Sequence, residues 1–245
     1  MPATTVRCEW TGGLQRFYLS GTYETVNVHA PAKFLEEFVG TATLSAGNTI
    51  WTELDVAGGD IARIADGENG VMSCVLTGAV EAQDATLHWG DERGINVKDG
   101  AIIEMRARFP VLPTLNAEIV CGVAGVHDLD NDTILESLWF KLDAATTASL
   151  LVAESNDTTN DNDDISTGVT VTTTPYYILR IDTTTNTDCK FYVNGANVGT
   201  GTTFDISNLT DAEGIMQPYL SVDKPAEAAE GSMYIDYFRA WWKRA

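Results

Sequence analysis

The sequence is short of positive charge. Only 15 of its 245 residues are lysine or arginine, against 35 aspartates and glutamates, and the formal net charge is −20. Binding to a phosphate backbone requires clustered basic side chains, whereas the one basic cluster is the pair Lys243-Arg244. The composition therefore argues against nucleic acid as a partner, and it predicts no attraction to anionic lipid.

Long hydrophobic runs are also missing. The longest apolar stretch, Ile119 to Val126, has eight residues, whereas a membrane-spanning helix needs roughly 20. Residues 1–10 do not show the charged and then apolar order of a signal peptide. We therefore expect no membrane partner and folding in a reducing cytoplasm.

Cysteine is scarce and widely spaced. The four cysteines are Cys8, Cys74, Cys121 and Cys189, and no two of them form a C-x-x-C pair. This spacing argues against a zinc site or a redox motif. Cys74 and Cys121 lie in apolar runs, where a free thiol behaves as a small hydrophobic side chain.

Helical periodicity is nearly absent, and short alternating runs take its place. Gly70–Thr77, Ala101–Phe109 and Tyr176–Asp182 are examples, separated by Gly, Asn, Asp and Pro. In the second run apolar and charged residues alternate, with Ile103, Met105, Ala107 and Phe109 on one face and Glu104, Arg106 and Arg108 on the other. This pattern predicts an all-β sandwich of two antiparallel sheets.

Two segments have clear strand signals and one does not. Asn194-Gly195 inside Asp188–Gly199 predicts a tight hairpin turn. The aromatic run Met233–Trp242 predicts a strand that is central or covered on both faces. The polar, acidic stretch Glu154–Ser166 predicts a solvated loop.

Residues 1–45 differ from the rest of the chain. They carry a possible strand pair, Leu14–Leu19 with Tyr23–Val28, followed by a possible helical turn at Ala32–Phe38. We expect this segment to be a β-rich attachment arm, and residues 46–245 to form the main domain.

The order of features after residue 50 resembles a known family. These features are Trp51, Gly58-Gly59, Gly70–Thr77, Gln83–Gly90, Ala101–Phe109, Val120–Gly125, Glu136–Asp143, Tyr177–Asp182, Phe191–Gly195 and Ile235–Ala240. The pattern resembles the concanavalin-like (laminin-G and glucanase-like) jelly roll, and more narrowly the structural proteins of tailed phages of aquatic bacteria.

The resemblance implies a role in a virion. It implies a capsid decoration (cement) protein or a head or tail appendage, made in the bacterial host cytoplasm. The implied partners are the major capsid protein or another virion protein, together with further copies of the chain in a dimer or trimer.

Catalytic patterns are hard to find. Retaining glucanases of this fold place two carboxylates about 5 Å apart, which residues two apart on a strand achieve. The run from Ile102 offers only Glu104, and Glu136 and Asp143 fall on opposite strand faces. The histidines His29, His88 and His127 are far apart in the sequence. The sequence therefore predicts a protein without enzymatic activity.

One acidic motif suggests a metal. Asp128, Asp130 and Asp132 alternate as at the start of a calcium loop. The rest of an EF-hand is missing, because Thr133 and Trp139 stand where glycine and a bidentate glutamate are needed. A structural calcium is therefore the alternative to a solvated loop, and no other cofactor is expected.

Carbohydrate binding is the alternative function. It needs exposed aromatic rings, whereas most tryptophans here lie in apolar alternation typical of a core. Trp241 and Trp242 are adjacent on one strand, so they face opposite ways. We expect partner contacts through Trp10, Arg16, Phe17, Tyr18 and Trp241. The alternative to capsid decoration is a carbohydrate-binding module on an appendage that contacts host glycans.

Overall fold

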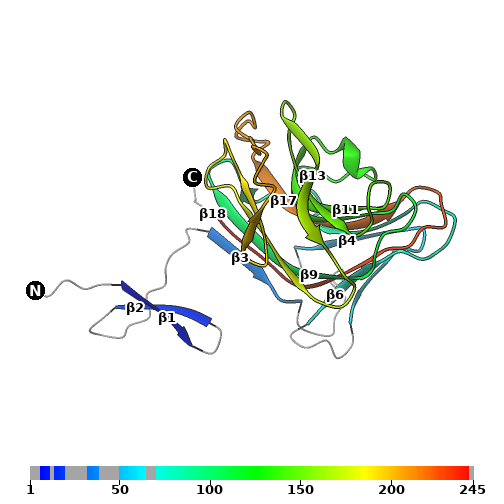
Figure 1. Cartoon of the computed structure of the whole chain (residues 1–245), viewed down its shortest axis with the longest axis horizontal. Coiled ribbons are helices and arrows are strands. Elements are labelled where there is room, and N and C mark those ends of the chain that lie inside the picture. Colours follow the sequence, from blue (N-terminus) through cyan, green and yellow to red (C-terminus); the bar gives the residue numbers. More distant parts are fainter. Residues whose placement is uncertain (1–5, 12–13, 20–31, 39–49, 65–69, 243–245) are drawn as a thin grey trace, which may run out of the picture.

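The computed structural model describes residues 6–11, 14–19, 32–38, 50–64 and 70–242. Its strands form two eight-stranded antiparallel sheets and one two-stranded hairpin (Figure 1). The hairpin consists of β1 (Val6–Thr11) and β2 (Leu14–Leu19).

Sheet 1 runs, in order, through β13 (Asp161–Thr170), β12 (Leu150–Asp157), β11 (Glu136–Asp143), β10 (Glu118–Ala124), β17 (Ile215–Lys224), β7 (Gln83–His88) and β4 (Thr52–Val56), and β8 (Ile95–Asn96) pairs with β17. Sheet 2 runs through β16 (Ala196–Val198), β15 (Lys190–Val193), β14 (Tyr177–Asp182), β9 (Ala101–Val111), β18 (Ser232–Trp242), β6 (Met72–Val75) and β5 (Asp60–Arg63), and β3 (Ala32–Glu36) pairs with β18. The two-sheet antiparallel sandwich predicted from the sequence is confirmed.

The only helical element among the described residues is the 3-10 turn η1 (Asn131–Thr133). In this described part, no helix is long and apolar enough to cross a membrane.

The main core lies between the two sheets and follows the predicted alternation. On β9, Ile103, Met105, Ala107 and Phe109 are all fully buried, whereas Arg106 and Arg108 on the opposite face are partly exposed. Buried Cys74, Cys121 and Cys189 are free thiols within this core. The period-two pattern therefore identified the inward face correctly.

The predicted hairpin and terminal strand are also confirmed. Asn194 and Gly195 have backbone φ angles of 50° and 81°, as the turn between β15 and β16 requires. β18 lies between β9 and β6, and its pairing with β9 shifts register between Ile235 and Tyr237. This irregularity lets Ile235 and Phe238 both face the core, which strict alternation would forbid.

Two local predictions were wrong. Residues 32–36, expected to form a helical turn, form β3, because pairing with residues 238–242 of β18, beyond the end of β6, overrides local preference. The stretch Glu154–Ser166, expected to be a loop, belongs to the hairpin of β12 and β13. β13 is an edge strand, so its acidic composition reflects an exposed strand rather than a missing one.

The N-terminal predictions are partly outside the described residues. Leu14–Leu19 is a strand, but it pairs with β1, and Tyr23–Val28 is not described. Trp10, Arg16, Phe17 and Tyr18 lie in β1 and β2, and their side chains are outside the described part. β3 pairs with the sandwich, so part of the segment 1–45 joins sheet 2, and the division of the chain at residue 45 stays a prediction.

A second apolar cluster lies on the outer face of sheet 1. Its members are Val120, Ala124, Ile134, Trp139 and Tyr219. The rings of Trp139 and Tyr219 are 5.9 Å apart, and Gly122 lies between them in the register of the sheet. A Cβ on Gly122 would lie 2.2 Å from the carbonyl oxygen of Leu138, so only glycine fits there.

Replacing Gly122 should therefore destabilise the sheet. We expect Gly122→Ala to lower the free energy of unfolding by about 1–3 kcal/mol, as overpacking does. Chemical denaturation measures this loss. Gly201→Ala is the matched control, because a Cβ at Gly201 meets no atom within 4 Å. Equal stability of the two variants would contradict the packing argument.

Candidate functional site

A loop covers the outer face of sheet 1. This segment, residues 125–135, is called the cover loop and contains η1. His127 Nε2 lies 3.1 Å from Asp84 Oδ2, and Asn131 Nδ2 donates to Asp223 Oδ1 at 2.5 Å. The hydroxyl of Tyr219 donates to the carbonyl of Asp128 at 3.1 Å. Contacts to β7 and β17 thus hold the loop over the sheet.

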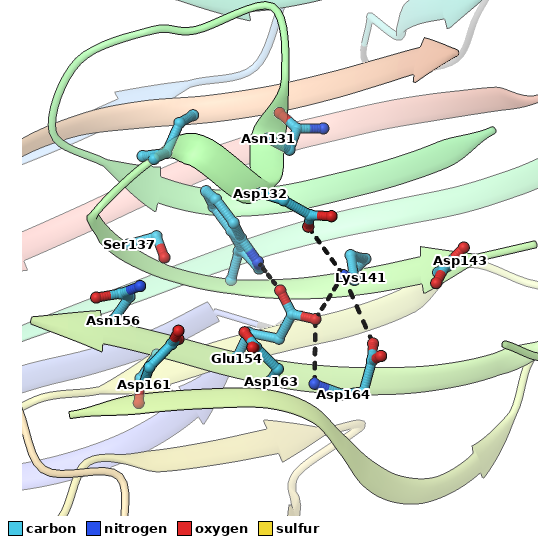
Figure 2. Close-up of a pocket in the computed structure, with 13 residues that line it drawn as sticks. Asn131, Asp132, Ser137, Lys141, Asp143, Glu154, Asn156, Asp161, Asp163 and Asp164 are labelled. Atoms are coloured by element: carbon cyan, nitrogen blue, oxygen red, sulfur yellow. Dashed lines mark hydrogen bonds and ion pairs between the residues drawn. The ribbon is translucent and has the colours of Figure 1, made fainter. Parts of the chain in front are cut away.

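Beside the cover loop, strands β11, β12 and β13 form a polar pocket of about 240 Å³ (Figure 2). Its lining side chains come from these strands and the loop: Asn131, Asp132, Ile134, Ser137, Trp139, Lys141, Asp143, Glu154, Ser155, Asn156, Asp161, Asp163 and Asp164. This pocket, called the acidic pocket, has six carboxylates and one lysine.

Lys141 holds the acidic pocket together. Its Nζ lies 2.8 Å from Glu154 Oε1 and 3.5 Å from a carboxylate oxygen of both Asp132 and Asp164 (Figure 2). A fourth carboxylate, that of Glu118, lies 3.9 Å away. Burial by itself would lower the pKa of Lys141, but these carboxylates outweigh it and raise that pKa, so the side chain is charged.

Glu154 also has several hydrogen-bond donors around its carboxylate. Besides Lys141, it accepts a hydrogen bond from Trp139 Nε1 at 2.6 Å and one from the backbone amide of Asp164 at 3.2 Å. The residue is only 4% exposed. Three donors around a buried carboxylate fix its position, so the floor of the pocket is pre-organised.

A β-bulge shapes the rim of the pocket. Ala153 pairs with Ile165 and Ser155 pairs with Asn162, so Asp163 and Asp164 together oppose the single residue Glu154. Asp164 has a positive φ of 50°. Consecutive residues on a regular strand face opposite sides, but this bulge lets both aspartates line the pocket.

A row of carboxylates crosses the same face of sheet 1. Asp84 pairs with Asp223, Asp223 with Glu118, and Glu118 with Asp143, on four neighbouring strands. Directly opposite residues have Cβ atoms about 4.5–5.5 Å apart. Glu118, Asp143 and Asp223 line a second cavity of about 450 Å³, called the row cavity, which shares Asp132 and Asp143 with the acidic pocket.

Crowding changes the protonation of this row. Burial raises the pKa of Glu118 to about 7, although Lys141 partly opposes the shift. Burial also raises the pKa of Asp223 well above its ordinary value, and the charges of Glu118 and Asp84 add to this effect. Near neutral pH Glu118 is therefore present both as carboxylate and as carboxylic acid, and Asp223 favours the acid form, which can donate a proton.

Two histidines lie at the other end of the row. The rings of His88 and His127 stack with centroids 4.9 Å apart, although the residues are distant in the sequence. Burial, together with the neighbouring His127, lowers the pKa of His88. His29, the third histidine, lies outside the described residues.

The aspartates predicted as calcium ligands have other contacts. Oδ1 of Asp128 accepts from the amide of Asp130, and Oδ1 of Asp130 accepts from the amide of Asp132. Asp132 faces Lys141. Throughout the described part of the chain, no three His, Cys, Asp or Glu side chains are grouped as metal ligands would be. Calcium binding therefore stays a prediction that this geometry does not support.

The tryptophan predictions largely agree with the structure. Trp51, Trp89 and Trp139 are buried. Trp242 is partly buried and packs against the core. Trp241 lies instead on the outer face of sheet 2, beside Arg239. The sequence did not indicate that Trp139 would line a pocket. The pocket also needs Lys141, on the same strand, and carboxylates from the cover loop, β12 and β13, and the fold alone brings these segments together.

No protein-family model matches the sequence, and no curated protein sequence matches it. Solved structures do resemble it. One comes from work on endo-acting O-glycanases of the human gut microbiota, with a TM-score of 0.60, 11% identity, and coverage of 86% of this chain and 99% of that chain. The carbohydrate recognition domain of Emp46p in its potassium-bound form has a TM-score of 0.57, 14% identity, and coverage of 86% and 96%.

A third similar structure is the endo-β-1,4-glucuronan lyase of the fungus Trichoderma reesei, with a TM-score of 0.52, 10% identity, and coverage of 78% of this chain and 90% of that chain. At such identities the likeness shows the fold alone. The chain therefore has a concanavalin-like, lectin-like jelly-roll sandwich, as the resemblance implied.

The expectation of a protein without enzymatic activity is contradicted by these neighbours. The O-glycanase work and the glucuronan lyase concern glycan-degrading enzymes, so this architecture also supports catalysis. The sequence argument considered paired carboxylates along one strand only, whereas Glu118 lies opposite Asp143 and Asp223 on the neighbouring strands.

The protonation of Glu118 predicts how stability depends on pH. Its pKa rises from 4.5 to about 7 on folding, so the folded chain binds this proton more tightly than the unfolded chain. This contribution to stability is present below about pH 4.5 and is lost as the pH rises through about 7. Because of Glu118, we expect the free energy of unfolding to fall by about 1–3 kcal/mol as the pH rises from about 5 to about 8.

Glu118→Gln, which mimics the protonated form, should reduce that dependence, and the part due to Glu154, whose pKa burial also raises to about 7, should remain. Denaturation curves at about pH 5 and about pH 8 measure it in both proteins. The exposed Glu81→Gln is the matched control and should behave as the unaltered chain does. A Glu118→Gln variant with the full pH dependence would show that another group is responsible.

Proposed function

We propose that the chain binds carbohydrate in the acidic pocket. The observation that carries this proposal is a pre-organised group of hydrogen-bond acceptors, ordered by one lysine, on the outer face of a lectin-like sandwich. Sugar hydroxyls donate hydrogen bonds, and carboxylates are strong acceptors for them. Ile134 and Trp139 also line the pocket, and because both are buried they offer a sugar ring only a small apolar area.

The charge of the pocket selects among glycans. Six carboxylates against one lysine leave the site negative, so it repels uronates, sulfates and sialic acids. The volume of about 240 Å³ is below the roughly 300–1,000 Å³ of sites for drug-sized ligands. The site therefore suits one ring of a neutral or amino sugar, with the rest of the glycan outside it.

Attachment to a virion stays a prediction from the resemblance. In a phage appendage, such a pocket would hold glycans of the host surface, which is the alternative that the sequence already allowed. Capsid decoration, a capsid-protein partner and location in the virion have no support beyond that resemblance.

Rim carboxylates offer a direct test. Asp161 and Asp163 are exposed, so their replacement should not disturb the fold. Binding of neutral and anionic oligosaccharides to the full chain would be screened on a glycan array, and the strongest binder would be measured by calorimetry. We expect a neutral or amino glycan, with affinity at least about tenfold lower in Asp161→Ala/Asp163→Ala.

The matched control is Asp60→Ala, which removes an exposed carboxylate from sheet 2 and should leave affinity unchanged. Exclusive binding of anionic glycans would contradict the proposal. So would equal affinities of the double variant and the control.

Glycan cleavage is a second candidate, favoured by the row cavity. Retaining glycosidases hold two carboxyl groups about 5–5.5 Å apart, and opposite residues in a sheet, whose Cβ atoms are about 4.5–5.5 Å apart, can bring their carboxyl groups that close. Glu118, with its pKa raised to about 7, suits the acid, and Asp143, directly opposite it on β11, is the candidate nucleophile. The bound oligosaccharide would be incubated with the chain and its reducing ends counted. Release that Glu118→Gln abolishes without loss of binding would support this candidate, and no release would exclude it for that substrate.

A further inference from the structure

Arginine and aromatic side chains cover the outer face of sheet 2, on the opposite side of the sandwich from the acidic pocket. This surface, called the arginine face, is built on β9, β14, β15 and β18. Its members are Arg106, Arg108, Tyr176, Arg180, Lys190, Tyr192, Tyr234, Tyr237, Arg239 and Trp241.

The guanidinium groups stack on the rings. Arg106 Cζ lies 4.4 Å from the ring centroid of Tyr176, and Arg108 Cζ lies 4.9 Å from that of Tyr234. Arg180 and Arg239 make similar contacts at 5.2–5.6 Å with Tyr192, Tyr237 and Trp241. Such stacking, within about 6 Å, contributes a modest stabilisation per contact at exposed sites. These contacts favour one arrangement of the arginine side chains before any partner binds.

Charge is nearly balanced on this face. Five of the 15 basic residues of the chain lie here. Four of them pair with carboxylates: Arg106 with Asp236, Arg180 with Asp182, Arg239 with Glu104, and Lys190 with Asp188. The surface is thus close to neutral in a protein whose formal net charge is −20.

Arg108 is the exception to this pairing. It forms no ion pair with any described carboxylate, and its buried Nε atom has no hydrogen-bond partner in the described part of the chain. Its guanidinium is held between Tyr176 and Tyr234. A planar fork that lies against two rings and lacks a carboxylate suits a bidentate contact from outside.

The composition also matches that of protein interfaces. Tyrosine, tryptophan and arginine are enriched at the residues that dominate binding energy. Two exposed apolar side chains lie on the same face: Leu35, 57% exposed and opposite Arg239, and Ile178, 39% exposed and opposite Arg106. An ordered aromatic surface with apolar side chains on it fits a protein partner better than solvent.

We propose that the arginine face binds a second copy of this chain in a two-fold dimer. Two molecules of net charge −20 repel each other through most contacts, and a nearly neutral face minimises that repulsion. A two-fold interface places the same face opposite itself, so it needs cations and carboxylates on one surface. The arginine face has both, and Arg108, which has no carboxylate of its own, is the cation left for a contact between the copies.

This inference does not rest on the proposed function. The acidic pocket lies on sheet 1, so pairing through sheet 2 leaves both pockets of a dimer open. Two open pockets would strengthen binding to a surface that carries many glycans, since the second contact becomes intramolecular.

Sedimentation equilibrium of the full chain over a dilution series tests the dimer. We expect the mass of two chains, and a dimer dissociation constant at least about 30-fold higher for Arg108→Glu. Leu35→Glu should weaken the dimer by a similar factor, and its exposure means that the fold tolerates the change. Arg93→Glu, which reverses the charge of an exposed arginine outside the face, is the control.

Circular dichroism would verify that each variant is folded. Should Arg108→Glu unfold, Leu35→Glu alone decides. A monomeric chain at every concentration would overturn the proposal, as would an assembly larger than two. A dimer that Arg108→Glu and Leu35→Glu weaken no more than Arg93→Glu does would overturn it as well.

Discussion

Lys141 stabilises the acidic outer face of sheet 1 by pairing with the carboxylates that gather there. Lys141 is 4% exposed and lies within 4 Å of four carboxylates, those of Glu118, Asp132, Glu154 and Asp164. Buried charges are tolerated only when they are paired, and removing one partner of such a group costs about 3–5 kcal/mol. The bulge of β13, the position of the cover loop and the shape of the acidic pocket all bring carboxylates to this one cation.

The two outer faces of the sandwich stabilise their charged side chains in different ways. On sheet 1, carboxylates outnumber cations, and the excess is relieved by raised pKa values at Glu118 and Asp223. On sheet 2, arginines pair with carboxylates and stack on aromatic rings. A negative, hollowed face suits a small polar ligand that donates hydrogen bonds, whereas a charge-balanced aromatic face suits a protein surface.

Local patterns predicted the fold well and the site poorly. The alternation in β9 and the Asn194-Gly195 turn are properties of adjacent residues, so they could be interpreted without knowing any partner strand. β13 was missed because its register includes a bulge and its edge position permits a polar composition. The carboxylate row was missed because Glu118 and Asp223 become neighbours only through long-range pairing, which no local pattern reveals.

Tryptophan indole signals in NMR spectra would test the location of the site most directly. Trp139 Nε1 donates to Glu154 at the floor of the acidic pocket, whereas Trp241 lies on the arginine face. The full chain would be titrated with the glycan that it binds best, and the two signals would be assigned with Trp139→Phe and Trp241→Phe. The account predicts that the Trp139 signal shifts and saturates while that of Trp241 stays in place. Movement of the Trp241 signal with no change at Trp139 would place the glycan on the wrong face and contradict the account.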